Sequence, residues 1–567
     1  MKKALLLFCG LLMYAHAQAT NFETAKDALV NMGVGWNLGN TLDAQDMSKT
    51  WTTTEQHETC WGQPVTKPGL LKMMKEAGFG AIRVPVTWYQ EMDSNGQVND
   101  AWMKRVKEVV DYVIDNGMYC ILNVHHDTGE GNQAWLIADE ENYTKNKSKY
   151  ENLWKQIATT FKDYDQRLLF ESYNEMLDKA KSWCYPSFNT SSKYDAIMAK
   201  SAYNAINSYA QSFVNTVRAT GGNNAGRNLV VNTYAASCGS GNWNEHLQDP
   251  LKEMKLPTDE VSNHLIFQVH AYPGLRKDNL SSIKDEVKAM MNDLKSILAA
   301  KGAPVIIGEW GTINDDSDVN YQKNRENYLD FCRYFVEEAK KNDIVTFYWM
   351  GLSNGPNRDL PAFNQPDLAE TIVKAYRGSD YIGSYPAPGD FQVEYVVNYN
   401  DQWSELFLYG DWNNSSPFKL SDYKGIRIEL DNDSHLSDLQ VKLYGRTDGQ
   451  EDYPKLTGAV STILFADSQE KIGNEITKIT LQKTISDPLT IKVKSATLIK
   501  ADDTETPGDI KVAWGCTMTT ESTPVSGIHQ IKAVYPENDR IYNLNGQHII
   551  SPSKGIYIKN GKKYVKK

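Results

Sequence analysis

Eight short apolar runs recur along residues 34–348 of this 567-residue chain, and segments with helical periodicity separate them. In one such segment Leu70, Met73, Met74 and Ala77 repeat at three- and four-residue intervals, and Gly78 follows as a helix stop signal. Strands that alternate with helices form a parallel sheet, and eight of them are enough to close a barrel. The expected strands are Val34–Trp36, Ala81–Val84, Tyr119–Val124, Leu168–Tyr173, Asn228–Asn232, Leu265–Val269, Val305–Ile307 and Val345–Tyr348.

An open, doubly wound sheet is the main alternative for such a pattern. That fold binds phosphate through a glycine-rich turn at the point where the strand order reverses. The glycines of Gly33-Val34-Gly35 lead into Trp36-Asn37 instead, which is not a phosphate-binding turn. We therefore predict an α/β chain whose residues 20–380 form a (β/α)8 TIM barrel.

Polar side chains stand at the carboxyl ends of six of the expected strands. In a TIM barrel these ends share one rim, where such folds build their active sites. A single histidine or arginine at a strand end is usually a satisfied structural group, but repetition in phase favours a functional site. The residues are Arg83, His125, His126, Asn174, Glu175, His270, Tyr272, Glu309 and Trp349.

Two glutamates on this rim, Glu175 and Glu309, each come at the end of an apolar run. A charge beside a buried strand is costly unless it faces a cleft. In a chain with 71 acidic residues, either glutamate alone would be read as a solvated or salt-bridged carboxylate. Together on one rim, the two predict acid/base chemistry on a glycosidic bond.

Six short motifs follow one another along the chain: Gly35–Asn40, Ile82–Val86, Leu122–His126, Asn174-Glu175, His270–Tyr272 and Ile307–Glu309. Together and in this order they resemble glycoside hydrolase family five, a large family of retaining endo-β-glucanases on a (β/α)8 barrel. The resemblance covers about residues 25–378. Gly35–Ala44 and Glu58–Gly62 are most similar to its endoglucanase and xyloglucanase subfamily.

This resemblance implies a role for each rim residue. It makes Glu175 the general acid/base and Glu309 the nucleophile of a double displacement, with Arg83 and Tyr272 stabilising ionised Glu309. It further implies that Asn174 holds the sugar 2-hydroxyl and that Trp349 supports the ring face. His125 and His270 would orient the pair and the sugar, and the expected contacts to neighbouring sugars are Asn40, His126 and Trp135.

Two departures from the family pattern leave the preferred substrate open. Met176 replaces the proline that usually follows Asn-Glu, and Tyr348–Gly351 differs from the usual Trp-Trp-Asp. We expect a secreted retaining endo-β-1,4-glucanase acting on cellulose-type, mixed-linkage glucan or xyloglucan. The alternatives are an endo-β-mannanase or xylanase on the same barrel, or a non-catalytic glycan-binding surface protein. The last is disfavoured because a pure binder needs neither carboxylate.

The first residues read as a secretory signal. Lys2-Lys3 precede an apolar stretch from Ala4 to Met13, and small residues follow up to Ala19. We expect a signal peptide at 1–19, no membrane span in the mature form, and a location outside a bacterial cell or at its surface.

Beyond the barrel the composition changes at a Pro/Gly-rich linker, residues 381–390, and helical periodicity fades. Short alternating runs then predict a β-sandwich at 391–500, whose aromatic side chains, Trp412 among them, would either stack on glucan or form its core. Carbohydrate binding and a purely structural role both stay open. A polar linker is expected at 501–538. At 539–567 a hairpin-like tail resembles the C-terminal sorting modules of some Gram-negative secretion systems.

Charge and motif content limit the partners. The net charge of −11 argues against a nucleic-acid partner. No C-x-x-C or H-E-x-x-H spacing occurs, so we predict no metal and no cofactor. The expected partner is a plant-type β-glucan, and the expected state is a monomer.

Overall fold

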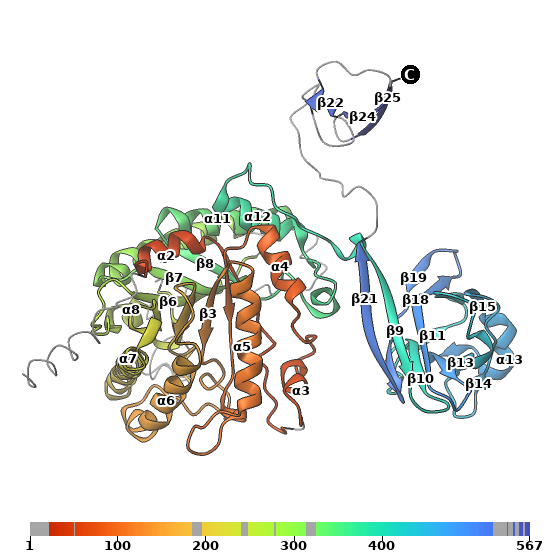
Figure 1. Cartoon of the computed structure of the whole chain (residues 1–567), viewed down its shortest axis with the longest axis horizontal. Coiled ribbons are helices and arrows are strands. Elements are labelled where there is room, and N and C mark those ends of the chain that lie inside the picture. The colour runs from red at the N-terminus through yellow and green to blue at the C-terminus, as the bar shows by residue number, and fades with distance from the viewer. Residues whose placement is uncertain are drawn as a thin grey trace, which may run out of the picture. The chain divides into compact units, whose positions relative to one another are not determined.

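A computed structural model describes residues 22–49, 51–183, 195–239, 248–276, 279–312 and 325–524, and four short strands between residues 541 and 566. The chain divides into two compact units, Met1–Pro388 and Gly389–Lys567 (Figure 1). The expected signal peptide at 1–19 lies outside the described residues. Within the described part, every helix is too short or too polar to cross a membrane.

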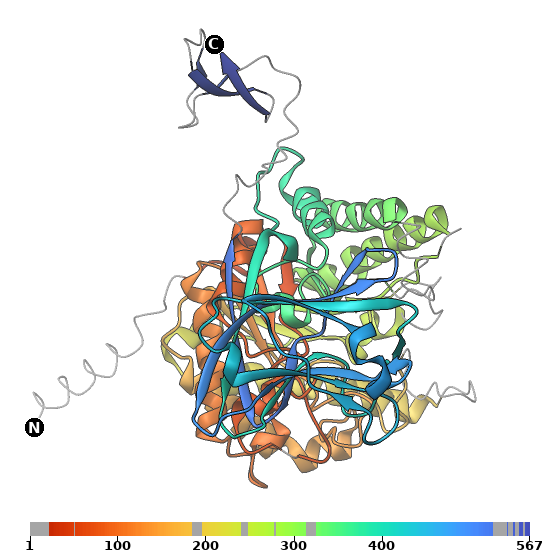
Figure 2. The same cartoon turned by 90° about the vertical axis from the view of Figure 1, so that its right-hand side faces the viewer.

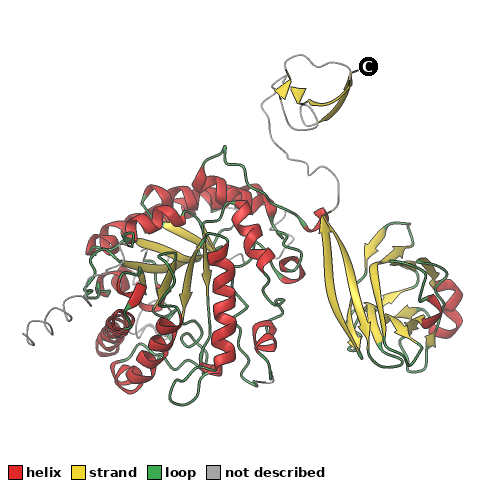
Figure 3. Ribbon diagram, viewed as in Figure 1, coloured by secondary structure: helices red, strands yellow, loops and turns green. Residues whose placement is uncertain are grey.

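The N-terminal unit is a closed barrel of eight parallel strands in chain order, in which β1 pairs with both β2 and β8. Helices surround the strands (Figure 3), which confirms the predicted TIM barrel. The strands are β1 Gly35–Asn37, β2 Ala81–Val84, β3 Tyr119–Asn123, β4 Leu168–Glu171, β5 Leu229–Asn232, β6 Leu265–Ala271, β7 Val305–Trp310 and β8 Val345–Tyr348. The helices are α2 Ala25–Met32, α3 Thr54–Thr59, α4 Pro68–Ala77, α5 Asp100–Asp115, α6 Glu140–Thr160, α7 Ala196–Ala219, α8 Gln248–Glu253, α9 Leu280–Asp293, α11 Arg325–Lys341 and α12 Pro366–Arg377.

Three strands extend past their expected ends, the first of them β1, which reaches Asn37. β6 continues to Ala271 and β7 to Trp310, so His270 and Glu309 are strand residues, paired in register. Register shifts occur between Val269 and His270, and between Ile307 and Trp310. Such irregularities re-aim side chains near active sites. Sequence periodicity does not reveal them, because the apolar run ends where the polar site begins.

The barrel interior is built in layers by the two-residue period of its strands. Ala81, Ile121 and Leu169 belong to an apolar cluster inside the barrel, whereas Ile82, Leu122 and Phe170 pack in the outer core with the helices. The next inward residues are polar and completely buried: Asn37, Arg83, Asn123, Glu171, Asn232 and Gln268. This polar layer forms the floor of the rim.

The C-terminal unit is built on two larger antiparallel sheets, which Figure 2 turns toward the viewer. One has the strand order β14-β13-β17-β10-β20 and the other β15-β12-β18-β9-β21, with β19 paired to β18. An apolar core that includes Leu406, Val441, Ile428 and Val493 joins them. The bounds are β9 Phe391–Tyr399, β10 Glu405–Tyr409, β12 Tyr423–Leu430, β13 Leu439–Tyr444, β14 Glu451–Asp452, β15 Val460–Leu464, β17 Lys478–Lys483 and β18 Leu489–Lys500, while the pair β11 Phe418–Lys419 and β16 Glu475–Ile476 and the short helix α13 Gln469–Ile472 complete the unit.

The expected linker at 501–538 is wrong over its described part. This part carries β19 Glu505–Pro507, β20 Lys511–Trp514 and β21 Cys516–Pro524, and β21 pairs along the whole of β9. The sandwich therefore extends to Pro524. Polar Thr- and Glu-rich composition suggested a linker, but an edge strand exposes one face and needs few apolar residues. Farther on, β22 Ile541–Tyr542, β23 His548–Ile549, β24 Gly555–Lys559 and β25 Lys562–Lys566 form a small sheet.

Candidate active site

Arg83 is the centre of a buried network in the polar layer. Its Nε and Nη2 donate to the two carboxylate oxygens of Glu171, at 2.7 and 2.8 Å. Nη1 donates to Glu309 Oε1 at 2.6 Å, and Nη2 also donates to Asn174 Oδ1 at 2.8 Å. Burial opposes the charge of Arg83, but the nearby Glu171 and Glu309 carboxylates raise its pKa. Arg83 is therefore a permanent cation held between two carboxylates.

Glu309 accepts hydrogen bonds at both oxygens. Arg83 donates to Oε1, and the Tyr272 hydroxyl donates to Oε2 at 2.7 Å. Burial raises the pKa of Glu309, while His270, Arg83 and the hydrogen bond from Tyr272 act in the opposite direction. The two donors favour the ionised form of this carboxylate.

Glu175 has different surroundings. Its Oε1 lies 2.8 Å from His270 Nδ1, and its side chain is 22% exposed, against 6% for Glu309. Burial raises the pKa of Glu175 to about 7, which Arg83 opposes and Glu171 reinforces. Burial also lowers the pKa of His270 to about 4, so His270 is neutral at neutral pH.

The two carboxylates face each other across a short gap. One oxygen of Glu175, one oxygen of Glu309 and a ring nitrogen of His270 all lie within 4.8 Å of one another. A protonated carboxyl and an ionised one at this separation can act on the same bond from opposite sides.

Histidines and tryptophans line the next part of the rim. Asn123 Nδ2 lies 3.0 Å from His125 Nδ1, and because the amide is the donor, His125 carries its proton on Nε2, 3.9 Å from Glu309 Oε1. The His125 ring stacks on Trp349 with centroids 5.9 Å apart, and it contacts His126 edge-on at 4.5 Å. Burial lowers the pKa of both histidines, that of His126 to about 4.

Two predicted site residues have their contacts elsewhere. The backbone N–H of Asn40, which adopts a φ of 59°, donates to Asp43 Oδ2 at 3.0 Å. Trp135 Nε1 donates to Asp127 Oδ1 at 2.6 Å, and Lys149 Nζ lies 4.6 Å from its ring centroid. The contacts recorded for these two residues do not include either carboxylate.

Sequence reasoning missed Glu171 and Trp61. Glu171 is completely buried and binds Arg83, Asn123 and Asn232. The sequence did contain a signal for Glu171, because this residue lies inside an expected strand. A carboxylate buried there must be paired with a cation or with hydrogen-bond donors. Trp61 is 39% exposed, and its ring centroid lies 5.3 Å from that of His126. A tryptophan within a loop offered no such signal.

In the part of the chain that the structure describes, two groups of side chains have spacings that would suit a metal ion. One is Glu175, His270 and Glu309, and the other is Asp43, His125 and His126. Asp43 already accepts from the backbone N–H groups of Asn40 and Thr41, at 3.0 and 2.8 Å. Hydrogen bonds therefore satisfy its carboxylate without a cation.

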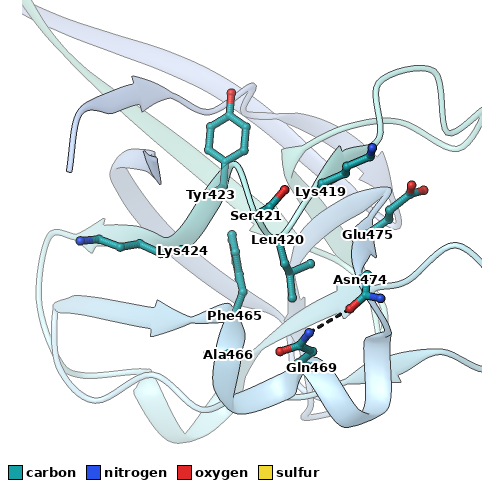
Figure 4. Close-up of a pocket in the computed structure, with 10 residues that line it drawn as sticks. All are labelled: Lys419, Leu420, Ser421, Tyr423, Lys424, Phe465, Ala466, Gln469, Asn474 and Glu475. Atoms are coloured by element: carbon teal, nitrogen blue, oxygen red, sulfur yellow. Dashed lines mark hydrogen bonds between the residues drawn. The ribbon is translucent and has the colours of Figure 1, made fainter. Parts of the chain in front are cut away.

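A separate hollow lies in the C-terminal unit (Figure 4). There Gln469 Nε2 donates to Asn474 Oδ1 at 2.9 Å, and the carboxylate of Glu475 pairs with Arg446 at 2.7 Å. Its described lining offers no second carboxylate to face Glu475, so it lacks the arrangement seen on the barrel rim. The lining residues are Lys419, Leu420, Ser421, Tyr423, Lys424, Phe465, Ala466, Gln469, Asn474 and Glu475.

Comparison with known proteins agrees with this geometry. Residues 43–355 match the family Cellulase (glycosyl hydrolase family 5). The chain is 34% identical over 417 residues to Endoglucanase A of Clostridium longisporum, which covers 66% of this chain and 73% of that relative.

Solved structures give the same result. A broad specificity GH5-4 endoglucanase from an uncultured bacterium is 63% identical, with a TM-score of 0.61, over 63% of this chain and 97% of that one. The family 5 enzyme PbGH5A of Prevotella bryantii, solved as a mutant with a xyloglucan tetradecasaccharide, is 42% identical, with a TM-score of 0.55, over 63% and 99% of the two chains. The chain belongs to glycoside hydrolase family 5 and is an endo-1,4-β-glucanase that acts on β-glucans.

Proposed function

We propose that this enzyme cleaves β-1,4-glucan by a retaining double displacement, with Glu309 as the nucleophile and Glu175 as the general acid/base. The observation that carries the proposal is the pair of carboxylate oxygens within 4.8 Å of each other. Retaining glycosidases place their two carboxyl groups about 5–5.5 Å apart, whereas inverting enzymes leave about 6.5–9.5 Å for a water molecule.

The unequal surroundings of the two carboxylates support this division of roles. Glu309 receives hydrogen bonds from Arg83 and Tyr272, which favour the charge that a nucleophile needs. Among the described residues Glu175 has no comparable pair of donors, and burial raises its pKa to about 7, which favours a proton available for the leaving group.

The reaction then proceeds in two balanced steps. Glu309 attacks the anomeric carbon while the Glu175 proton passes to the departing glycosidic oxygen, and a glycosyl ester of Glu309 forms. Ionised Glu175 next accepts a proton from water as that water attacks the same carbon. This second attack releases Glu309 and returns the proton to Glu175.

The remaining rim residues are assigned to the sugar. Arg83 holds Asn174 Oδ1, so the Asn174 amide N–H groups are available to the 2-hydroxyl. Trp349 supports a ring face, and His125 and His270 orient the sugar and the acid. Asn40, His126 and Trp135 are assigned to neighbouring sugars.

The substrate is a cellulose-type, mixed-linkage or xyloglucan chain. Support comes from the relatives, because one is described as a broad specificity endoglucanase and another was solved with a xyloglucan oligosaccharide. We further assign residues 20–380 to catalysis, 1–19 to a secretory signal and 539–567 to sorting, which places a monomeric enzyme outside a bacterial cell or on its surface.

Two variants test the mechanism. Glu309→Ala should lose nearly all activity, and azide should restore part of it by replacing the missing nucleophile. Glu175→Ala should keep its glycosylation rate on aryl glucosides with good leaving groups far better than on glucan, because such groups need little proton donation.

The stereochemistry of the first product provides an independent measurement. NMR during early hydrolysis should show the β-anomer, and an α-anomer would rule out retention. Reducing-sugar release from mixed-linkage glucan, xyloglucan, carboxymethylcellulose, mannan and xylan would identify the preferred backbone. A preference for mannan or xylan would contradict the proposed substrate.

A further inference from the structure

The outer face of the five-stranded sheet carries a connected array of polar side chains. Val441, Leu481 and Leu406 are neighbours in register and point into the core. The adjacent residue on each of these strands points to the opposite face. There the paired residues form a second row of Gln440, Gln482 and Glu405. Gln440 Nε2 donates to Gln482 Oε1 at 2.7 Å, and Gln482 Nε2 donates to Glu405 Oε1 at 2.8 Å. The row therefore has a fixed geometry.

Aromatic rings and lysines continue this array. The Tyr444 hydroxyl donates to Glu405 Oε2 at 2.7 Å. Lys442 Nζ and Lys478 Nζ each lie 4.4 Å from the Tyr444 ring centroid, and Lys478 Nζ also lies 5.5 Å from that of Trp412. Two lysines and Glu405 thus stand beside two aromatic rings on one face.

Trp412 is 48% exposed, although hydrogen bonds and a ring contact hold it and its loop. Asp411 Oδ1 accepts from the Asn413 backbone N–H at 2.8 Å, and Asn414 Oδ1 accepts from Lys478 Nζ at 3.0 Å. The Trp412 indole donates to Ala513 O at 3.3 Å, and its ring contacts Phe407 at 5.1 Å between centroids. A large ring held in place this way loses little conformational entropy when a ligand covers it.

The outer face of the other sheet has different chemistry. It is covered by ion pairs such as Arg427–Glu505 and Lys492–Glu521, at 2.5 and 2.6 Å. That is the ordinary solvated face of an antiparallel sheet. The aromatic and amide array is thus particular to one side of the sandwich.

This array matches an uncharged sugar chain better than other ligands. Lys442 and Lys478 stand with Glu405 and Glu451, so the face lacks the positive excess that nucleic acid requires. Its exposed rings, Trp412 and Trp514, are 48% and 42% exposed and stand beside polar and charged side chains such as Glu405. Aromatic rings accept the faces of pyranoses, and amide and charged groups bind their hydroxyls.

We propose that this face is a second β-glucan-binding site, in which exposed Trp412 and partly exposed Lys442 meet the sugar, and the largely buried Tyr444, Lys478, Glu405 and Gln482 hold them in place. It is distinct from the catalytic cleft and binds without hydrolysis. A polymer that reaches both sites is held at a raised effective concentration near the cleft. The inference depends on the polysaccharide substrate of the enzyme, and not on which carboxylate is the nucleophile.

Calorimetry on the full chain tests this proposal. In a Glu309→Gln background, which prevents turnover, cellohexaose should titrate two sites per chain. Adding Trp412→Ala should leave one site or weaken the second about tenfold or more, as expected for loss of a central aromatic contact. Trp412→Phe, which keeps a ring, should restore part of the affinity.

The matched control is Leu464→Ala, which truncates a 46% exposed side chain on β15 of the other sheet and should leave both sites intact. Lys478→Met provides a second probe if the tryptophan variant unfolds. With Glu309 restored, Trp412→Ala should keep kcat/KM for short soluble oligosaccharides and lose retention on swollen cellulose. A single site in the parent, or equal affinity in the Trp412 and Leu464 variants, would overturn the proposal.

Discussion

Glu171→Gln tests how the buried charges of the barrel control catalysis. Glu171 is completely buried and binds Arg83 through two hydrogen bonds of 2.7 and 2.8 Å. The amide keeps the shape of the side chain but removes its charge, so Arg83 retains Glu309 as its remaining carboxylate partner among the recorded contacts. Removing one charged partner of a buried ion pair costs about 3–5 kcal/mol of folding free energy, because the other charge stays buried.

The same substitution should move the pH profile of the enzyme. The Glu171 charge raises the pKa of Glu175, and Arg83 lowers it. Removing the negative charge therefore lowers that pKa. Since Glu175 must keep its proton to act as an acid, the basic limb of kcat/KM should shift to lower pH.

Glu58→Gln is the matched control. Glu58 is also completely buried and binds Arg105 through bonds of 2.8 and 3.1 Å, and it links α3 to α5. Urea unfolding should show a similar loss of stability in both variants, whereas kcat/KM measured on soluble mixed-linkage glucan from about pH 4 to pH 9 should shift only in Glu171→Gln. Identical pH profiles in the two variants would refute a charge role for Glu171 and leave it a purely structural one.

In the wild type, kcat/KM should fall as the pH rises through about 7, because burial raises the pKa of Glu175 to about 7 and the acid then loses its proton; a profile that stays flat to pH 9 would contradict this. Gly308→Ala should lower kcat/KM about 10- to 100-fold, while binding of cellohexaose persists. The new Cβ would lie 2.3 Å from the buried Gln268 side chain, which stands beside His270. Wild-type rates in this variant would show that the Gln268 side chain can move freely. A chain ending at Pro388 should fold and keep its activity on soluble glucan, since β1 and β8 close the sheet within the first unit. An insoluble or inactive product would show that the barrel depends on the sandwich.

The barrel and its rim were predictable because they depend on local periodicity. Each apolar run indicated a strand, and parallel strands in a barrel bring their carboxyl ends together whatever the exact bounds. Arg83, Asn174, Glu175, His270, Tyr272 and Glu309 were therefore expected on one rim, and the structure joins them through direct contacts. The strand bounds and the linker at 501–538 were less predictable, because hydrogen bonding between distant segments decides where a strand ends.

The sequence alone determined the fold class, the family and the identity of the two candidate carboxylates, since these depend on residue type and on order along the chain. Tertiary structure decided how those carboxylates differ. Glu309 acquires donors from β2 and from the segment after β6, whereas Glu175 meets a neutral histidine in a buried setting that raises its pKa. Only folding brings Glu171 under Arg83 or aligns Glu405 with Gln482 across two strands. Charge and hydrogen bonding act over a few ångströms in space, and separation along the chain does not report that distance.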